Sequence, residues 1–135
     1  LLGSNKKAEN AFKECLSLNP NHEPALFNLA RVYQNRKQWQ KSNDILMDFL
    51  KIKGPSSSVY SVMAWNNLMS GKLEEASKLY EKILRYESNN QEALINLAKI
   101  YYSLGKKSIS ESYIKRALKL DLLQSQSNEL EKLLK

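Results

Sequence analysis

The apolar and small residues of this chain recur at an interval of 34 residues. Within each interval, apolar side chains follow one another at spacings of three and four, which places them on one side of a helix. Each interval has room for two helices and two short turns. The pattern therefore predicts helices at 5–19, 23–36, 39–53, 57–70, 73–87, 91–104, 107–121 and 125–134.

Four positions mark the predicted turn inside each interval: Gly3, Lys37, Gly71 and Gly105. Glycine accepts the left-handed conformation that ends a helix, so Lys37 is expected to carry a modest strain cost in the same place. Small residues recur at fixed distances from these turns and are expected to let two helix axes approach closely. They are Ala8, Ala30, Ser42, Ala64, Ala76, Ala98 and Ser110.

A fixed period of this length is typical of helical repeat proteins. The fullest copy holds Leu97-Ala98, Tyr101, Gly105 and Ala117-Leu118, and the partial copies hold Leu29-Ala30 with Tyr33, and Gly71 with Ala76 and Tyr80. This pattern resembles the tetratricopeptide repeat (TPR) family. The chain departs from the family where Asn67 replaces the usual tyrosine, and where Leu26, Tyr60 and Leu94 occupy the aromatic position of the first helix.

The resemblance implies an all-α fold: an α-solenoid in which TPR-like helix pairs form a right-handed superhelix of about 3.5 repeats, with a C-terminal capping helix. We expect a single domain that is a fragment of a longer chain. Its parts are a half repeat at 1–20, repeats at 21–54, 55–88 and 89–122, and the capping helix at 123–135.

We make a separate prediction for each end of the pattern. Residues 1–3 line up with the end of a first helix, so the half repeat needs native sequence upstream or another copy of the chain to cover it. At the other end, Ser125 or Ser127 is predicted to begin a helix that either caps the last repeat or binds a partner. Its apolar side consists of Leu130, Leu133 and Leu134.

The resemblance implies that the first helix of each pair lines a concave groove. The predicted groove residues are Phe27, Asn28, Arg31, Gln34, Ser61, Trp65, Met69, Ile95, Asn96, Lys99 and Tyr102. Arg31, Trp65 and Lys99 occupy the same place in successive repeats, which predicts a cation, an aromatic anchor and a second cation. The alternative is that Trp65 packs between neighbouring helices.

Such a groove suits a peptide or helix of another protein, so the predicted function is that of a protein-interaction scaffold or adaptor. Some members of the family hold acidic chaperone C-termini in a carboxylate clamp. The clamp positions hold Phe27, Arg31, Val62, Glu92 and Asn96 here, so the clamp is incomplete. Homo-oligomerisation through the half repeat or the groove is the first alternative function.

The formal net charge of +7 raises a second alternative, an anionic polymer on the convex face. Lysines on the predicted second helices are mixed with acidic residues, which is typical of a solvated face and disfavours nucleic acid. The densest basic patch holds Lys106, Lys107, Lys115, Arg116 and Lys119.

The inventory of reactive residues predicts no enzyme, no cofactor and no metal site. His22 is the single histidine, and the chain has no phosphate-binding glycine loop. Cys15 is the single cysteine and is expected to be a buried structural thiol rather than a reactive one. No apolar run approaches the roughly 20 residues that span a bilayer. We expect a soluble chain, with the cytoplasm favoured.

Overall fold

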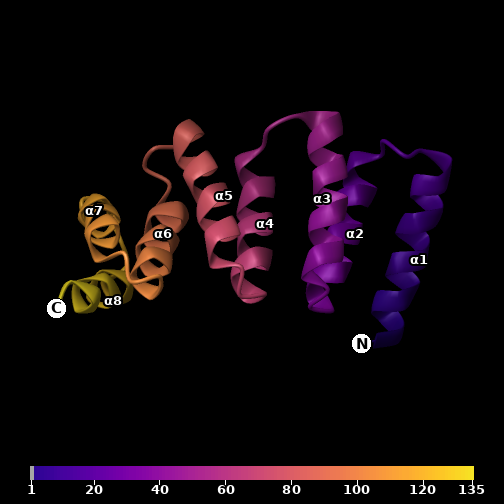
Figure 1. Ribbon diagram of the computed structural model, residues 1–135. Coiled ribbons are helices and arrows are strands. Elements are labelled where there is room, and N and C mark those ends of the chain that lie inside the picture. The colour runs from indigo at the N-terminus through magenta and orange to yellow at the C-terminus, as the bar shows by residue number, and fades with distance from the viewer. Residues whose placement is uncertain (1) are drawn as a thin grey trace. The chain divides into compact units, whose positions relative to one another are not determined.

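The computed structural model describes residues 2–135, and of residue 2 it describes the backbone only. Residues 2–135 form eight α-helices and no strand (Figure 1). The helices follow one another in chain order: α1 (Leu2–Leu18), α2 (Glu23–Asn35), α3 (Trp39–Lys53), α4 (Ser57–Met69), α5 (Leu73–Tyr86), α6 (Gln91–Ser103), α7 (Lys107–Leu118) and α8 (Gln124–Leu134). The predicted all-α helical-repeat fold is confirmed. The expected helix boundaries agree with the observed ones to within three residues.

The first predicted turn is wrong. Gly3 lies inside α1, and α1 begins three residues before the expected start. Glycine tolerates a left-handed turn but does not require one, and helical hydrogen bonding satisfies its backbone equally well. Leu1, which the sequence analysis aligned with a preceding helix, lies outside the described residues.

The first helix of each pair begins in the same way. His22, Ser56 and Asn90 stand 34 residues apart, and each accepts a hydrogen bond from the backbone N–H three residues later. These bonds satisfy one of the free N–H groups at the start of α2, α4 and α6. Three different side chains therefore cap the helices at equivalent positions, and His22 has a structural role as one of these caps.

The ends of these helices also match. Lys37, Gly71 and Gly105 all have positive φ angles, of 60°, 81° and 74°. After α2, the N–H groups of Lys37 and Gln38 donate to the carbonyls of Gln34 and Tyr33, and the same pair of bonds follows α6. This pattern closes a helix with a left-handed residue. The expected left-handed conformation of Lys37 is confirmed.

The chain divides into two compact units, and the division falls between Ser70 and Gly71. The first unit contains α1 to α4 and the second contains α5 to α8. The boundary lies inside the predicted repeat 55–88, between its two helices. Each unit is described by itself below.

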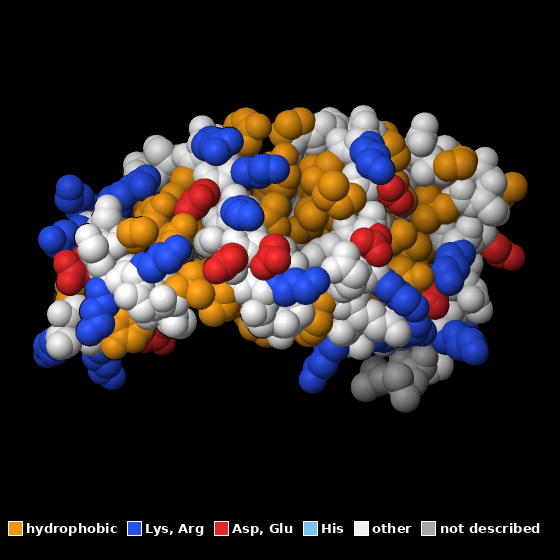
Figure 2. All heavy atoms as spheres, viewed as in Figure 1, with side chains coloured by type: hydrophobic (Ala, Val, Ile, Leu, Met, Phe, Trp, Pro, Cys, Tyr) orange, Lys and Arg blue, Asp and Glu red, His pale blue; other side chains and the backbone are white. Residues whose placement is uncertain are grey.

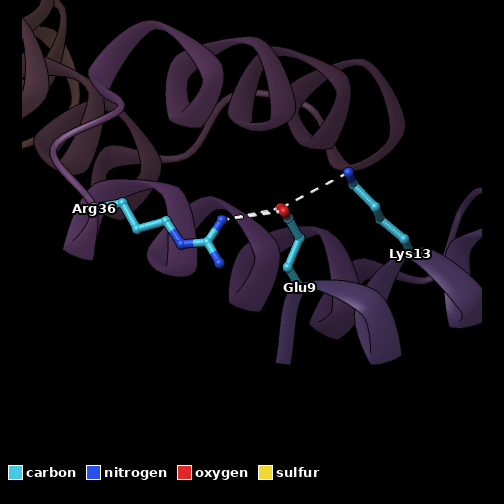
Figure 3. Close-up of polar contacts among 3 residues, drawn as sticks. All are labelled: Glu9, Lys13 and Arg36. Carbon is cyan, nitrogen blue, oxygen red and sulfur yellow. Dashed lines mark hydrogen bonds and ion pairs between the residues drawn. The ribbon is translucent and has the colours of Figure 1, made fainter. Parts of the chain in front are cut away.

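In the first unit, α2 and α3 form the central helix pair. Leu29 and Ala30 of α2 and Leu46 of α3 are all buried, as the apolar pattern predicts. An ion pair holds α1 in place, because the Arg36 guanidinium after α2 donates to both carboxylate oxygens of Glu9 at 3.1 and 3.2 Å (Figure 3). Lys13, one turn further along α1, adds a longer contact of 3.8 Å to the same carboxylate.

In the second unit, α8 completes the core. Leu130 is fully buried in a cluster with Leu94, Ile95, Ala98, Ile114 and Ala117, and Leu133 packs against that cluster. The predicted serine caps are wrong, because α8 begins after Leu123, whose N–H donates to the Gln126 side chain at 3.0 Å. Leu134 remains 40% exposed, so the apolar side of α8 is covered over only part of its length.

Candidate functional site

The first unit presents two half-exposed apolar side chains side by side on α4. Trp65 and Met69 are each 44% exposed and lie one turn apart, so they share a face of the helix. On α2, Asn28 and Arg31 are exposed at the same spacing of about one turn. Apolar, amide and guanidinium groups are thus available on the two first helices of this unit.

A hydrogen bond joins the two helices close to these residues in the chain. The Gln34 side-chain N–H donates to Oδ1 of Asn66 at 2.9 Å. Gln34 lies one turn after Arg31, and Asn66 follows Trp65 directly. The bond therefore joins the part of α2 that carries the cation to the part of α4 that carries the aromatic.

Asn66 belongs to a larger polar cluster inside the unit. Its side-chain N–H₂ group donates to Oγ of Ser42 at 3.0 Å and to Oδ1 of Asn43 at 2.9 Å. The Asn43 side-chain N–H₂ group donates in turn to Oδ1 of Asn67 at 3.0 Å. We call Gln34, Ser42, Asn43, Asn66 and Asn67 the amide network. All of its members except half-buried Gln34 are buried.

The 34-residue pattern by itself does not predict the amide network. The signal was available, because the residues 34 positions before and after Asn66 are Val32 and Ile100, and both are buried and apolar. A buried asparagine at an otherwise aliphatic position needs hydrogen-bond partners. The unusual character of position 66 is visible only when the repeats are compared with one another, and not in any single repeat.

Two other predicted groove residues of this unit have partners inside it. The Phe27 ring packs against Phe49 of α3, with 6.1 Å between ring centroids. Gln34 uses its N–H₂ group on Asn66, and Ser61 is half-buried. The exposed predicted residues of the first unit are Asn28, Arg31, Trp65 and Met69.

The remaining predicted residues lie on α6 in the second unit, and several are engaged there. Ile95 is only 7% exposed and belongs to the core cluster. The Asn96 N–H₂ group donates to the Tyr80 hydroxyl at 3.2 Å. The Lys99 ammonium lies 2.7 Å from the Glu129 carboxylate of α8, so the predicted second cation already has an acidic partner.

A cleft of about 540 Å³ lies over this face of α6. It is lined by Asn90, Gln91, Glu92, Ile95, Asn96, Lys99 and Gln126. Tyr102 lies apart from these residues, in a smaller cleft of about 200 Å³ beside the end of α8. Gln126 and Glu129 of α8 join the α6 surface, which the sequence does not predict, because the docked face of a short helix depends on packing.

Tyr80, Tyr101 and Glu129 of this unit have shifted pKa values. Burial and the nearby Glu92 carboxylate raise the pKa of Tyr80. Burial, together with a hydrogen bond to Glu81, raises the pKa of Tyr101 to about 12. The Lys99 ammonium lowers the pKa of Glu129 through a hydrogen bond and through its charge. Each of these groups has a side-chain partner within the unit.

Other chemistry finds little support in residues 2–135. No group of three or more His, Cys, Asp or Glu side chains is placed to hold a metal ion, and no helix in that range is long and apolar enough to cross a bilayer. Cys15 is half-buried, so the expected burial of its thiol is only partial. α1 has neighbours on only part of its surface, because it packs mainly against α2.

The surface charge is mixed. Figure 2 shows basic side chains interspersed with acidic and hydrophobic ones over the face in view. Within the predicted basic patch, Arg116 donates to the carbonyl of Ser88 at 3.0 Å and lies 5.7 Å from the Tyr113 ring centroid. Part of the patch is thus committed to contacts within its own unit.

Comparisons with known proteins agree on the kind of repeat. Two tetratricopeptide repeat family models match residues 11–42 and 67–128. The chain is 29% identical over 101 residues to the BBSome complex member BBS4 of Mus musculus, a match that covers 75% of this chain and 19% of that protein. The chain therefore spans about a fifth of the length of the curated relatives that it matches.

Solved structures share the fold at low sequence identity. A tetratricopeptide repeat protein from Parabacteroides merdae superposes with a TM-score of 0.87 at 18% identity, over 98% of this chain and 53% of that one. YrrB, described as a TPR protein with an unusual peptide-binding site, superposes with a TM-score of 0.75 at 12% identity, over 89% and 62%. At these identities the likeness concerns the fold alone.

Proposed function

The chain belongs to the tetratricopeptide repeat family, whose members are generally protein-interaction scaffolds, and from this premise we propose that it binds a peptide or helix of another protein. The binding surface that we propose is the α2–α4 face of the first unit. Asn28, Arg31, Trp65 and Met69 form it. The cleft on α6 is a second, more polar contact region.

The half-exposure of Trp65 carries this proposal. A tryptophan that served only to fill space between helices would be largely buried, whereas this side chain is 44% exposed beside an equally exposed Met69. Tryptophan and arginine are the residues in which binding energy most often concentrates. Trp65 and Met69 would receive an apolar side chain of the partner.

Arg31 determines which polar group the partner should carry. Its guanidinium is exposed on α2 near the Gln34–Asn66 bond that joins the two helices. Guanidinium groups pair with carboxylates through two parallel hydrogen bonds. The ligand class is therefore a segment with a leucine or aromatic side chain close to an aspartate or glutamate. The overall charge of +7 favours encounter with an acidic segment.

A displayed random peptide library tests the proposal. Peptides selected on the unsubstituted protein should combine an apolar residue with an acidic one, and Trp65→Ala should weaken their binding by roughly 2 kcal/mol, or about 30-fold. Met47→Ala is the matched control, because Met47 is 47% exposed but lies on α3. Equal binding by both variants, with folding intact, would remove Trp65 from the function.

Arg31→Met separates the charge contribution from the apolar one. The substitution keeps much of the side-chain volume but removes the guanidinium. We expect a several-fold loss of affinity at low salt that shrinks as salt rises, because salt screens exposed charges. A loss that is independent of salt would mean that Arg31 contributes through packing.

Two alternatives have their own tests. Leu18 at the end of α1 is 89% exposed, which favours self-association through α1 as a further candidate. Light scattering on a size-exclusion column, over a range of concentrations, would detect it. Charge reversal at Lys115 and Lys119 tests an anionic polymer on the basic patch, since such binding weakens steeply with salt.

A further inference from the structure

Two members of the amide network, Asn66 and Gln34, stand where the other repeats carry aliphatic or aromatic residues. Asn66 corresponds to Val32 and Ile100, and Gln34 corresponds to Leu68 and Tyr102. An aliphatic side chain at position 66 would fill the same space without hydrogen-bond partners. Buried polar groups are frequently no more stabilising than well-packed apolar ones, so stability alone does not require an asparagine at this position.

Hydrogen bonds differ from apolar contacts in having direction. The Asn66 side chain makes three of them, one from Gln34 of α2 and one each to Ser42 and Asn43 of α3. Their lengths lie between 2.9 and 3.0 Å, and they leave the amide group towards two different helices. Sliding α4 along its neighbours, or turning it about its own axis, would break at least one of them.

Trp65 adjoins this arrangement, since it shares a peptide bond with Asn66. Asn67 on the other side is also fixed, by the Asn43 side chain at 3.0 Å. The backbone that carries Trp65 is thus tied at two successive residues. Gln34 extends the tie to the end of α2, one turn after Arg31.

We propose that the amide network is a positioning device that fixes the rotation of α4 and so sets Trp65 at a defined distance from Arg31. The inference rests on the proposed function, in which these two residues contact the partner. The network members themselves are positioning residues, because four of the five are buried away from any ligand. A partner would then meet an apolar anchor and a cation at a fixed spacing.

A triple substitution tests the proposal. Gln34→Leu, Ser42→Ala and Asn66→Ile place in unit 1 the residues that stand 34 positions later, Leu68, Ala76 and Ile100. We expect the variant to fold. Peptides selected on the unsubstituted protein should nevertheless bind it at least tenfold more weakly, although Trp65 and Arg31 are unchanged.

A second readout needs no ligand. In a Trp39→Phe background, Trp65 is the one remaining tryptophan of the chain. Time-resolved fluorescence anisotropy then reports its local motion, and the fast component should grow in the triple variant. Unchanged anisotropy together with unchanged affinity would overturn the proposal and leave the network with a purely structural role.

Two further variants serve as a fallback and as a control for the triple substitution. Ser42→Ala alone removes one hydrogen bond of Asn66 and should cost two- to fourfold in affinity, so it decides the matter if the triple variant does not fold. Ser77→Ala is the matched control, because Ser77 is 5% exposed in unit 2 and donates to the Glu74 carbonyl at 2.7 Å. Its loss should lower stability without changing peptide affinity.

The proposed function and this inference fail in different ways. If Trp65→Ala binds the selected peptides normally, the proposed function is wrong. Anisotropy still decides whether the network holds Trp65. If Trp65→Ala abolishes binding but the triple variant binds normally and its anisotropy is unchanged, the function stands and the positioning role is wrong.

Discussion

Asn66 of α4 and Ile100 of α6 occupy equivalent places 34 residues apart, and both are fully buried or nearly so. Asn66 joins α2, α3 and α4 through directed hydrogen bonds, whereas the second unit relies on an apolar cluster closed by Leu130 of α8. One repeat pattern thus accommodates an apolar core with a buried amide network in the first unit and an apolar core without that network in the second. Apolar contacts supply free energy with little preference for orientation, and buried amides supply orientation with little net free energy.

The largest expected effect concerns the apolar core. Leu130→Ala should destabilise the second unit by about 2–5 kcal/mol, because it removes a fully buried side chain and leaves a cavity. Urea unfolding followed by circular dichroism would measure the change. Leu134→Ala, at a site 40% exposed, is the control and should change stability by no more than about 0.5 kcal/mol. Equal effects at the two sites would place α8 outside the core.

The two cores should also differ in their response to alkaline pH. Burial and Glu81 raise the pKa of Tyr101 from its ordinary value of 10.0 to about 12, and the pKa of Tyr113 is raised as well by burial and by Glu81. The fold therefore favours the neutral phenols. Their contribution is complete below pH 10 and is lost as the pH rises from about 10 towards 12. The amide network contains no titrating group.

Urea unfolding at pH 8 and pH 11 would reveal this difference. We expect the second unit to lose stability over this range, and Tyr101→Phe to reduce the loss, because the phenol that must ionise is gone. Tyr101→Phe should also cost some stability at pH 8, since the hydroxyl donates to Glu81. If the loss at pH 11 is the same with and without the substitution, Tyr101 is not the group responsible.

The sequence predicted local structure better than it predicted side-chain partners. Helix boundaries and the left-handed turn at Lys37 follow from spacing and backbone chemistry, which are local properties. Lys99 and Ile95 were placed on the groove face from spacing alone, but α8 packs over part of that face and engages both. That outcome depends on how a separate helix docks, which periodicity does not encode.

In the candidate site, too, the sequence predicted local features better than side-chain partners. Trp65 was predicted to be either an anchor or a packing residue, and its exposure favours the anchor. Asn66, its neighbour, went unnoticed because a single asparagine in a helix is usually a surface residue. Its burial became clear from its partners on two other helices. The aliphatic residues at the equivalent positions, Val32 and Ile100, are the signal in the sequence that marks Asn66 as unusual.

The smallest expected effect contrasts the turns of the two units. Lys37 of the first unit has a φ angle of 60°, where Gly71 and Gly105 stand in the second. A left-handed backbone costs an ordinary L-residue about 1–2 kcal/mol. Glycine avoids that cost but loses about 0.5–1 kcal/mol more conformational entropy on folding. Lys37→Gly should therefore stabilise the first unit by about 0.5–1 kcal/mol in urea unfolding.

Gly105→Ala is the reciprocal change and should destabilise the second unit by a similar amount. A Cβ atom at Gly105 would meet no heavy atom within 4 Å, so any loss comes from the backbone conformation and not from a clash. If Lys37→Gly destabilises the protein instead, the Lys37 side chain must make a contribution that exceeds the strain. The first unit would then depend on a charged turn as well as on buried amides, and the contrast between the units would be wider than their cores alone suggest.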